Sequence, residues 1–179
     1  MAGRDKATHE QQGVLLDANF LIHLSKRKSG GLSPQEVRHC DAAIAHLRLY
    51  SRIGLQPYVS QLALAEYQTY GQLGALPMTF FRQLDFGRAA AAKAGEFGRQ
   101  LHRWRKEDPM GLGPRKTLGI DMCTLAQAHC HPKIRFVGTG DGPLLARCQR
   151  LAKAGLTDLF AVNTYGAAHA GDYGGMDLS

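Results

Sequence analysis

The sequence predicts a single α/β domain in which helices cover both faces of a parallel sheet. Short apolar runs alternate along the chain with longer amphipathic segments, which is typical of this class. Several helix starts carry capping signals, and acidic residues recur directly after the apolar runs. At 179 residues the chain is long enough for one sizeable core, and no shift in composition marks a second domain.

The first predicted strand lies at residues 14–16, a run of three apolar side chains that ends at Asp17. Asn19 follows two residues later, and an apolar helix begins at Phe20. Asp17 has two interpretations: it caps this helix, or it is a functional carboxylate held at the end of a buried strand. The second is favoured because three further acidic residues occupy comparable junctions, namely Glu66, Asp121 and Asp141.

The next two helices begin at recognisable caps. The segment SPQE at 33–36 forms a capping box with proline at the first helical position, and it predicts a helix over 34–51. Residues 57–60 predict a short strand, and Ser60 is the expected N-cap of the following helix. Glu66 on that helix is expected towards its packed face. The alternative is that its side chain reaches solvent at the rim.

In the middle of the chain, residues 71–77 predict a loop, residues 80–86 a short strand and residues 87–105 a helix. A turn-rich connector at 107–116 and a second helix at 117–130 follow. Asp121 falls in the first turn of the last of these helices. The helix dipole alone favours an acidic residue there by a few tenths of a kcal/mol. A structural explanation of Asp121 therefore also stays open.

The last predicted elements are a strand at 134–138, a helix at 143–154 and a strand at 159–162. Thr139, Gly140 and Asp141 follow the first of these strands directly. Alternating strands and helices imply right-handed crossovers, so the strand carboxyl ends share one edge and the four acids face it. The chain outside the domain, residues 1–12 and 166–179, is polar or glycine-rich and is expected to form flexible tails.

The net charge of +7 suggests a polyanionic partner. Basic clusters lie beside glycine-containing loops, and we expect five residues to contact RNA phosphates: Lys26, Arg27, Lys28, Arg115 and Lys116. The alternative is that these loops are merely solvated. No apolar run approaches membrane-spanning length and the first twelve residues do not resemble a signal peptide, so a cytoplasmic location is expected.

Four carboxylates that converge without a cation repel one another, which raises some of their pKa values. This repulsion predicts that changing Asp121 to Asn stabilises the metal-free protein. A hard divalent cation removes the repulsion, and Mg²⁺ and Mn²⁺ prefer carboxylate and water ligands. Oxygen-only ligation beside a basic surface suggests metal-assisted phosphodiester chemistry.

The order and surroundings of the acids resemble the PIN domain, a family of Mg²⁺/Mn²⁺-dependent ribonucleases that includes the VapC-type toxins of toxin–antitoxin pairs. The matching segments are LLDAN around Asp17, SQLALAE up to Glu66, GIDMCTLAQA around Asp121 and FVGTGD ending at Asp141. The resemblance spans residues 14–162. It implies a doubly wound parallel sheet of about five strands, in a single PIN-like domain over residues 13–165.

Carried over residue by residue, the resemblance implies that Asp17 and Asp121 bind Mg²⁺ or Mn²⁺ directly. Glu66 and Asp141 then complete the acidic pocket, partly through water, while Asn19 and Thr139 orient carboxylates or water by hydrogen bonds. The implied activity is endoribonuclease cleavage of single-stranded or looped RNA, which leaves 5′-phosphate and 3′-hydroxyl ends. An antitoxin protein and a second copy of the chain, in a homodimer, are the expected protein partners.

Two other functions stay open at the level of the sequence. A PIN-like module could bind RNA or a protein without cutting, and metal-dependent cleavage would exclude this. An Asp-nucleophile phosphatase is expected to end its first strand in D-x-D, whereas Asn19 occupies the second position here. A mononucleotide-binding phosphate loop is disfavoured because the sequence contains no G-x-x-x-x-G-K motif.

Overall fold

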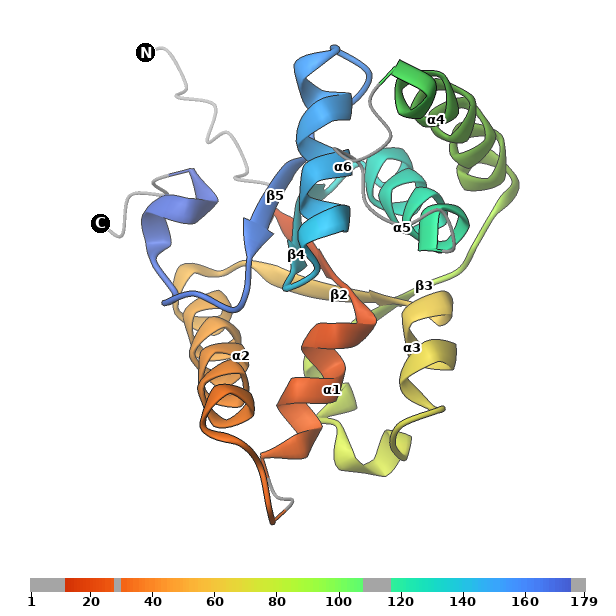
Figure 1. Ribbon diagram of the computed structural model, residues 1–179. Coiled ribbons are helices and arrows are strands. Elements are labelled where there is room, and N and C mark those ends of the chain that lie inside the picture. The colour runs from red at the N-terminus through yellow and green to blue at the C-terminus, as the bar shows by residue number, and fades with distance from the viewer. Residues whose placement is uncertain (1–11, 28–29, 108–116, 175–179) are drawn as a thin grey trace, which may run out of the picture.

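The computed structural model describes residues 12–27, 30–107 and 117–174. Within them, five parallel strands form one sheet in the order β3-β2-β1-β4-β5 (Figure 1). The strands are β1 (Gly13–Leu16), β2 (Gln56–Ser60), β3 (Arg82–Leu84), β4 (Ile134–Thr139) and β5 (Phe160–Asn163). The predicted α/β class, with about five parallel strands and flanking helices, is confirmed.

Six α-helices flank the sheet within the described residues: α1 (Ala18–Lys26), α2 (Pro34–Ile53), α3 (Gln61–Tyr67), α4 (Arg88–Glu107), α5 (Leu118–Cys130) and α6 (Gly142–Lys153). The predicted capping box at the start of α2 forms, and Ser60 caps α3 by accepting from the backbone N–H of Ala63 at 3.0 Å. Helix α1 begins two residues earlier than expected, directly after β1. No helix of the described segments combines the length and apolar character that a membrane crossing requires.

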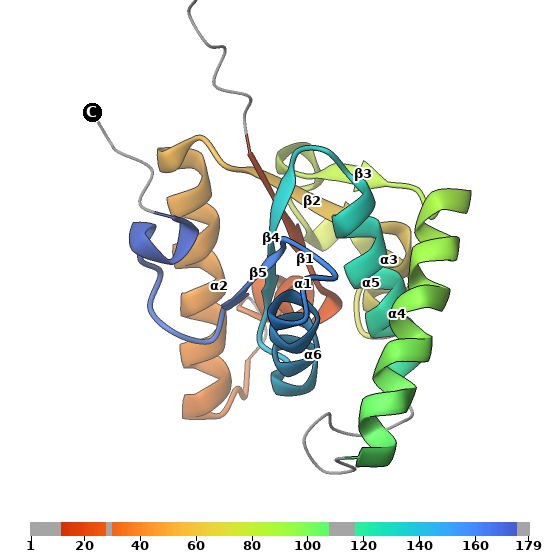
Figure 2. The same ribbon diagram turned by 90° about the horizontal axis from the view of Figure 1, so that it is seen from above.

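The pleat of the central strand divides the interior into two apolar cores. Val14 and Leu16 face one side of the sheet, where they pack with residues of α1, α2 and α3. Leu15 faces the other side and packs with residues of α4, α5 and α6. Figure 2 shows α2 and α4 on opposite sides of the strands. All four residues of β1 are buried, so this strand holds the next residue, Asp17, on a rigid base.

The strand order places a topological switch point between β1 and β4. From β1 the chain proceeds outward to β2 and β3, and it then returns to add β4 and β5 on the other side. In open α/β sheets of this kind, ligands bind in the crevice outside the carboxyl ends of the two strands where the order reverses. The residues that directly follow β1 and β4 therefore lie at the edge where sheets of this kind bind ligands.

The expectation of a flexible tail over 166–179 is wrong for residues 166–174. A 3₁₀ turn at Ala170–Tyr173 brings Tyr173, 0% exposed, into the core beside α2. The Tyr173 hydroxyl lies 3.0 Å from His46 Nδ1 and 2.8 Å from the Tyr50 hydroxyl. The ordered domain therefore extends past the predicted boundary at residue 165. Residues 1–11 and 175–179 lie outside the described residues.

Changing Tyr173 to Ala should lower the free energy of unfolding by about 3–5 kcal/mol, because the substitution removes a fully buried ring and leaves a cavity. The matched control is Tyr70→Ala, since Tyr70 is 68% exposed and should change stability little. Urea unfolding of both variants, followed by circular dichroism, measures the difference. Equal midpoints for Tyr173→Ala and the wild type would restore the flexible-tail interpretation.

Candidate functional site

A cavity of about 130 Å³ lies outside the carboxyl ends of β1 and β4. Its wall comes from α1, α3, α5 and α6, which surround the centre of the view in Figure 1. The structure brings the four predicted acids together here, because all of them line this cavity: Asp17, Glu66, Asp121 and Asp141. Asn19 also lines it, and its role in orienting carboxylates or water stays a prediction.

Asp17 is both a helix cap and a cavity residue, so its two interpretations are compatible. One carboxylate oxygen accepts from the Phe20 N–H at 2.9 Å, and the other accepts from the Thr139 hydroxyl. The side chain is only 7% exposed. The pKa of Asp17 is raised to about 7, chiefly by burial and in smaller part by the charges of Asp141 and Glu66, while the two hydrogen bonds oppose the shift.

Thr139 links the ends of the two central strands. Its hydroxyl donates to Asp17 and accepts from the Asp141 N–H at 2.9 Å. The Asp141 carboxylate in turn accepts from the Leu144 N–H at 3.1 Å, so it caps α6 while it lines the cavity. Between them, Gly140 has no room for a side chain, because a Cβ would lie 2.0 Å from the ring of Tyr165.

Asp121 is paired with a cation that the chain itself supplies. Its carboxylate accepts from the guanidinium of Arg147 on α6, and this arginine is 0% exposed. Arg147 also donates to the Thr117 hydroxyl at 3.0 Å. Burial raises the pKa of Asp121 to about 6, against the lowering effect of Arg147. The ion pair explains how Asp121 tolerates its buried position in the first turn of α5.

Arg147 was missed by the sequence analysis, although a signal for it exists. The apolar stripe of α6 consists of Leu144, Cys148 and Leu151, all of them buried. Arg147 falls on this stripe at helical spacing. Because charged residues are almost never fully buried unpaired, an arginine on an apolar stripe predicts a buried acidic partner elsewhere in the chain.

Glu66 lies at the rim of the cavity rather than against the packed face of α3. Its side chain is exposed, which agrees with the alternative interpretation given above. Partial burial and the nearby charge of Asp141 raise the pKa of Glu66. Glu66 is thus the acid of the cavity with the most contact with solvent.

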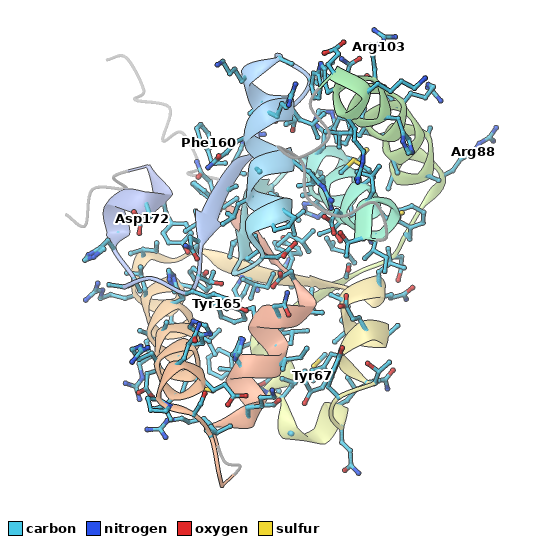
Figure 3. All side chains as sticks on the ribbon, in the orientation of Figure 1. Tyr67, Arg88, Arg103, Phe160, Tyr165 and Asp172 are labelled. Carbon is cyan, nitrogen blue, oxygen red and sulfur yellow. The ribbon has the colours of Figure 1, made fainter. Side chains whose placement is uncertain are left out.

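A histidine and tyrosine cluster lies beside the acids and was also not predicted. Tyr165 lies between α1 and α2 (Figure 3), where its hydroxyl is 3.0 Å from His23 Nε2. Its ring stacks on His39, with centroids 3.8 Å apart and planes at 8°. Burial raises the pKa of Tyr165, and the charges of Asp17 and Asp141 add to the shift. The cluster therefore packs close to the acidic cavity.

The structure does not bring Lys26 and Arg27, the two predicted RNA-binding residues that it describes, to the cavity. Lys26 and Arg27 lie at the end of α1 opposite Asp17, where they pair with Glu36 at 3.5 Å and Asp41 at 2.8 Å. The other three residues expected to contact RNA lie outside the described residues: Lys28, Arg115 and Lys116. A role in RNA binding stays a prediction for all five.

The donor atoms of the cavity fit a hard divalent cation. They include four carboxylates. Burial, with a smaller effect of the neighbouring acids, raises the pKa values of Asp17 and Asp121, and a cation would stabilise their charged forms. As the side chains lie, no three acids, histidines or cysteines of the described segments converge on one ion. Glu66 is exposed and can turn inward, whereas Asp121 is held by Arg147.

The ion pair reverses the expected effect of changing Asp121 to Asn. In EDTA, Asp121→Asn should lower the free energy of unfolding by about 3 kcal/mol, because it leaves the buried Arg147 without its counter-charge. The relief of repulsion that predicted a gain in stability is smaller. The control is Asp158→Asn, which breaks an exposed pair with Arg135 at 2.8 Å and should cost at most about 1 kcal/mol. A variant Asp121→Asn that melts above wild type would contradict this prediction.

The raised pKa of Asp17 predicts a pH dependence of the metal-free protein. Between about pH 4 and pH 7 the folded protein keeps Asp17 protonated while the unfolded chain ionises it, so stability falls as pH rises through this window. The loss should reach on the order of 4 kcal/mol and should level off above pH 7. Urea unfolding in EDTA at a series of pH values, for wild type and Asp17→Asn, measures it. Parallel curves for the two proteins would show that Asp17 is not the group that titrates.

No protein-family model matches the sequence, and no curated protein matches it. The structure is similar to a chain in the crystal structure of VapBC2 from Rickettsia felis bound to a DNA fragment from their promoter. The TM-score is 0.51 at 14% sequence identity, and the match covers 85% of this chain and 98% of that chain. At this identity the similarity concerns the fold alone. It supports a PIN-like arrangement of the single α/β domain, with its five-stranded parallel sheet and flanking helices.

Proposed function

We propose that the protein is a Mg²⁺/Mn²⁺-dependent endoribonuclease that cleaves RNA phosphodiester bonds at the acidic cavity. The observation that carries this proposal is the convergence of four carboxylates, from four separate places in the chain, on the crevice outside β1 and β4. The solved structure with a similar fold is a VapBC complex, which supports a VapC-like nuclease. It also supports a role as the toxin of a toxin–antitoxin pair, with an antitoxin as the protein partner.

A bound divalent cation would supply a more acidic water and would stabilise the leaving oxygen of the phosphodiester. Asp17 is fixed for ligation because both of its carboxylate oxygens are oriented by hydrogen bonds from the chain. Asp141 is fixed at the start of α6 in the same way. Glu66 has the solvent contact and the raised pKa that suit a carboxylate taking up the proton of the attacking water.

The size of the cavity favours a phosphodiester within a longer chain over a free small molecule. Its volume of about 130 Å³ is below the roughly 300–1,000 Å³ of pockets that enclose small ligands. It therefore suits one phosphate group rather than a whole nucleotide. Asn19, at the position where an Asp-nucleophile phosphatase is expected to carry its second aspartate, lines the cavity as an amide. The amide at this position favours a nuclease over an Asp-nucleophile phosphatase.

Incubation of the purified protein with a mixed RNA pool, in Mg²⁺, Mn²⁺ or EDTA, tests the proposal. We expect cleavage with either metal, none in EDTA, and product ends that carry 5′-phosphate and 3′-hydroxyl groups. Changing Asp17 to Asn should slow cleavage by about 100-fold or more, because losing a ligand costs at least as much as losing a partner that orients one. Asp158→Asn is the control, since this exposed acid precedes β5 and therefore lies at the opposite edge of the sheet.

Undiminished cutting by a rigorously purified Asp17→Asn protein would contradict the proposed site. RNA binding by the wild type without any cutting would instead favour the alternative of a binding module. In cells, growth arrest on expression of the wild type, and its absence with Asp17→Asn, is the matching result for a toxin.

A further inference from the structure

Arg147 places a positive charge against Asp121, one of the acids that line the cavity, although Arg147 is not itself a lining residue. A guanidinium does not lose its proton in proteins, and this one is wholly buried. It contacts the Asp121 carboxylate and the Thr117 hydroxyl. Its position on the apolar stripe of α6, between Leu144 and Cys148, keeps it inside the domain. Arg147 therefore has no short path to solvent by which it could release Asp121.

The other three acids of the cavity lack a positively charged partner in the ion pairs of the described residues. Asp17 and Asp141 accept hydrogen bonds from neutral hydroxyl and backbone N–H groups. Among the ion pairs of the described residues, none includes Asp17, Glu66 or Asp141. Among these four acids, Asp121 alone is therefore paired with a positive side chain in an ion pair of the described residues.

We infer that Arg147 takes the place of a second divalent cation, so that the cavity binds one metal ion, through Asp17, Glu66 and Asp141. In this arrangement Asp121 anchors Arg147 and is not a metal ligand, because a divalent ion on the same carboxylate would be repelled by the guanidinium. Arg147 is a positioning residue, since it touches neither substrate nor solvent. The inference rests on the proposed function in taking a divalent cation as the ligand of the cavity.

Counting bound Mn²⁺ tests the inference without any RNA. Electron paramagnetic resonance of free Mn²⁺, during titration of the metal-free protein at fixed pH, gives the number of sites and the Kd. The decisive variant carries Arg147→Met together with Asp121→Asn, which removes both charges of the pair and leaves neither partner buried alone. The matched control carries Arg135→Met with Asp158→Asn, which does the same to an exposed pair.

We expect one Mn²⁺ per wild-type chain, and one per chain of the decisive variant with a Kd within about threefold of wild type. The single variant Arg147→Met, which frees Asp121, should bind a second Mn²⁺ or bind the first at least tenfold more tightly. A wild type that binds two ions, or a decisive variant whose affinity falls tenfold or more, would overturn the inference and make Asp121 a ligand. Where Arg147→Met fails to fold, the decisive variant alone settles the question.

The two proposals fail in different ways. If the wild type binds no Mn²⁺ and does not cut RNA, the nuclease proposal is wrong. The role of Arg147 is then decided by Arg147→Met: a gain of Mn²⁺ binding supports it, and no gain overturns it. If the wild type cuts RNA and binds two ions, the nuclease proposal stands and the inference about Arg147 does not.

Discussion

The burial of Asp17 at the end of the central strand is the constraint on which the candidate site depends. A carboxylate in that position is costly unless hydrogen bonds satisfy it, and the chain supplies them from Thr139 and from the Phe20 N–H. The first bond ties the end of β1 to the end of β4, and the second starts α1. Thr139 also holds the backbone of Asp141. The hydrogen bonds that satisfy the buried Asp17 carboxylate therefore also fix the positions of Thr139 and of the start of α1.

Negative charge is distributed unevenly around the cavity. A buried arginine forms an ion pair with Asp121. Asp17 accepts hydrogen bonds from neutral groups, and its pKa is raised to about 7, chiefly by burial. Among the ion pairs of the described residues, none includes Asp17, Glu66 or Asp141. The rim position of Glu66 adds an acid whose side chain meets solvent, where incoming ligands first arrive.

The sequence could predict what depends on neighbouring residues. Apolar runs and caps located the strands and helices. The ends of two strands located Asp17 and Asp141, and the helices that carry Glu66 and Asp121 face the same edge, because parallel strands share one carboxyl edge. What depends on distant pairs was missed: Asp121 and Arg147 are 26 residues apart, and His46 and Tyr173 are 127 apart. The glycine-rich composition of residues 166–179 predicted a tail, although Tyr173 within it packs into the core.

The distance along the chain between Asp17 and Thr139, 122 residues, has a consequence for synthesis. Chains emerge from the ribosome from the N-terminus onward, and contacts between remote segments form only after both have emerged. Until β4 has been made, Asp17 lacks its hydroxyl partner, and until α6 has been made, Asp121 lacks its cation. A nascent chain surrounded by ribosomal RNA therefore carries all the residues of β1 and no assembled cavity. The candidate site can therefore assemble only after synthesis has passed α6.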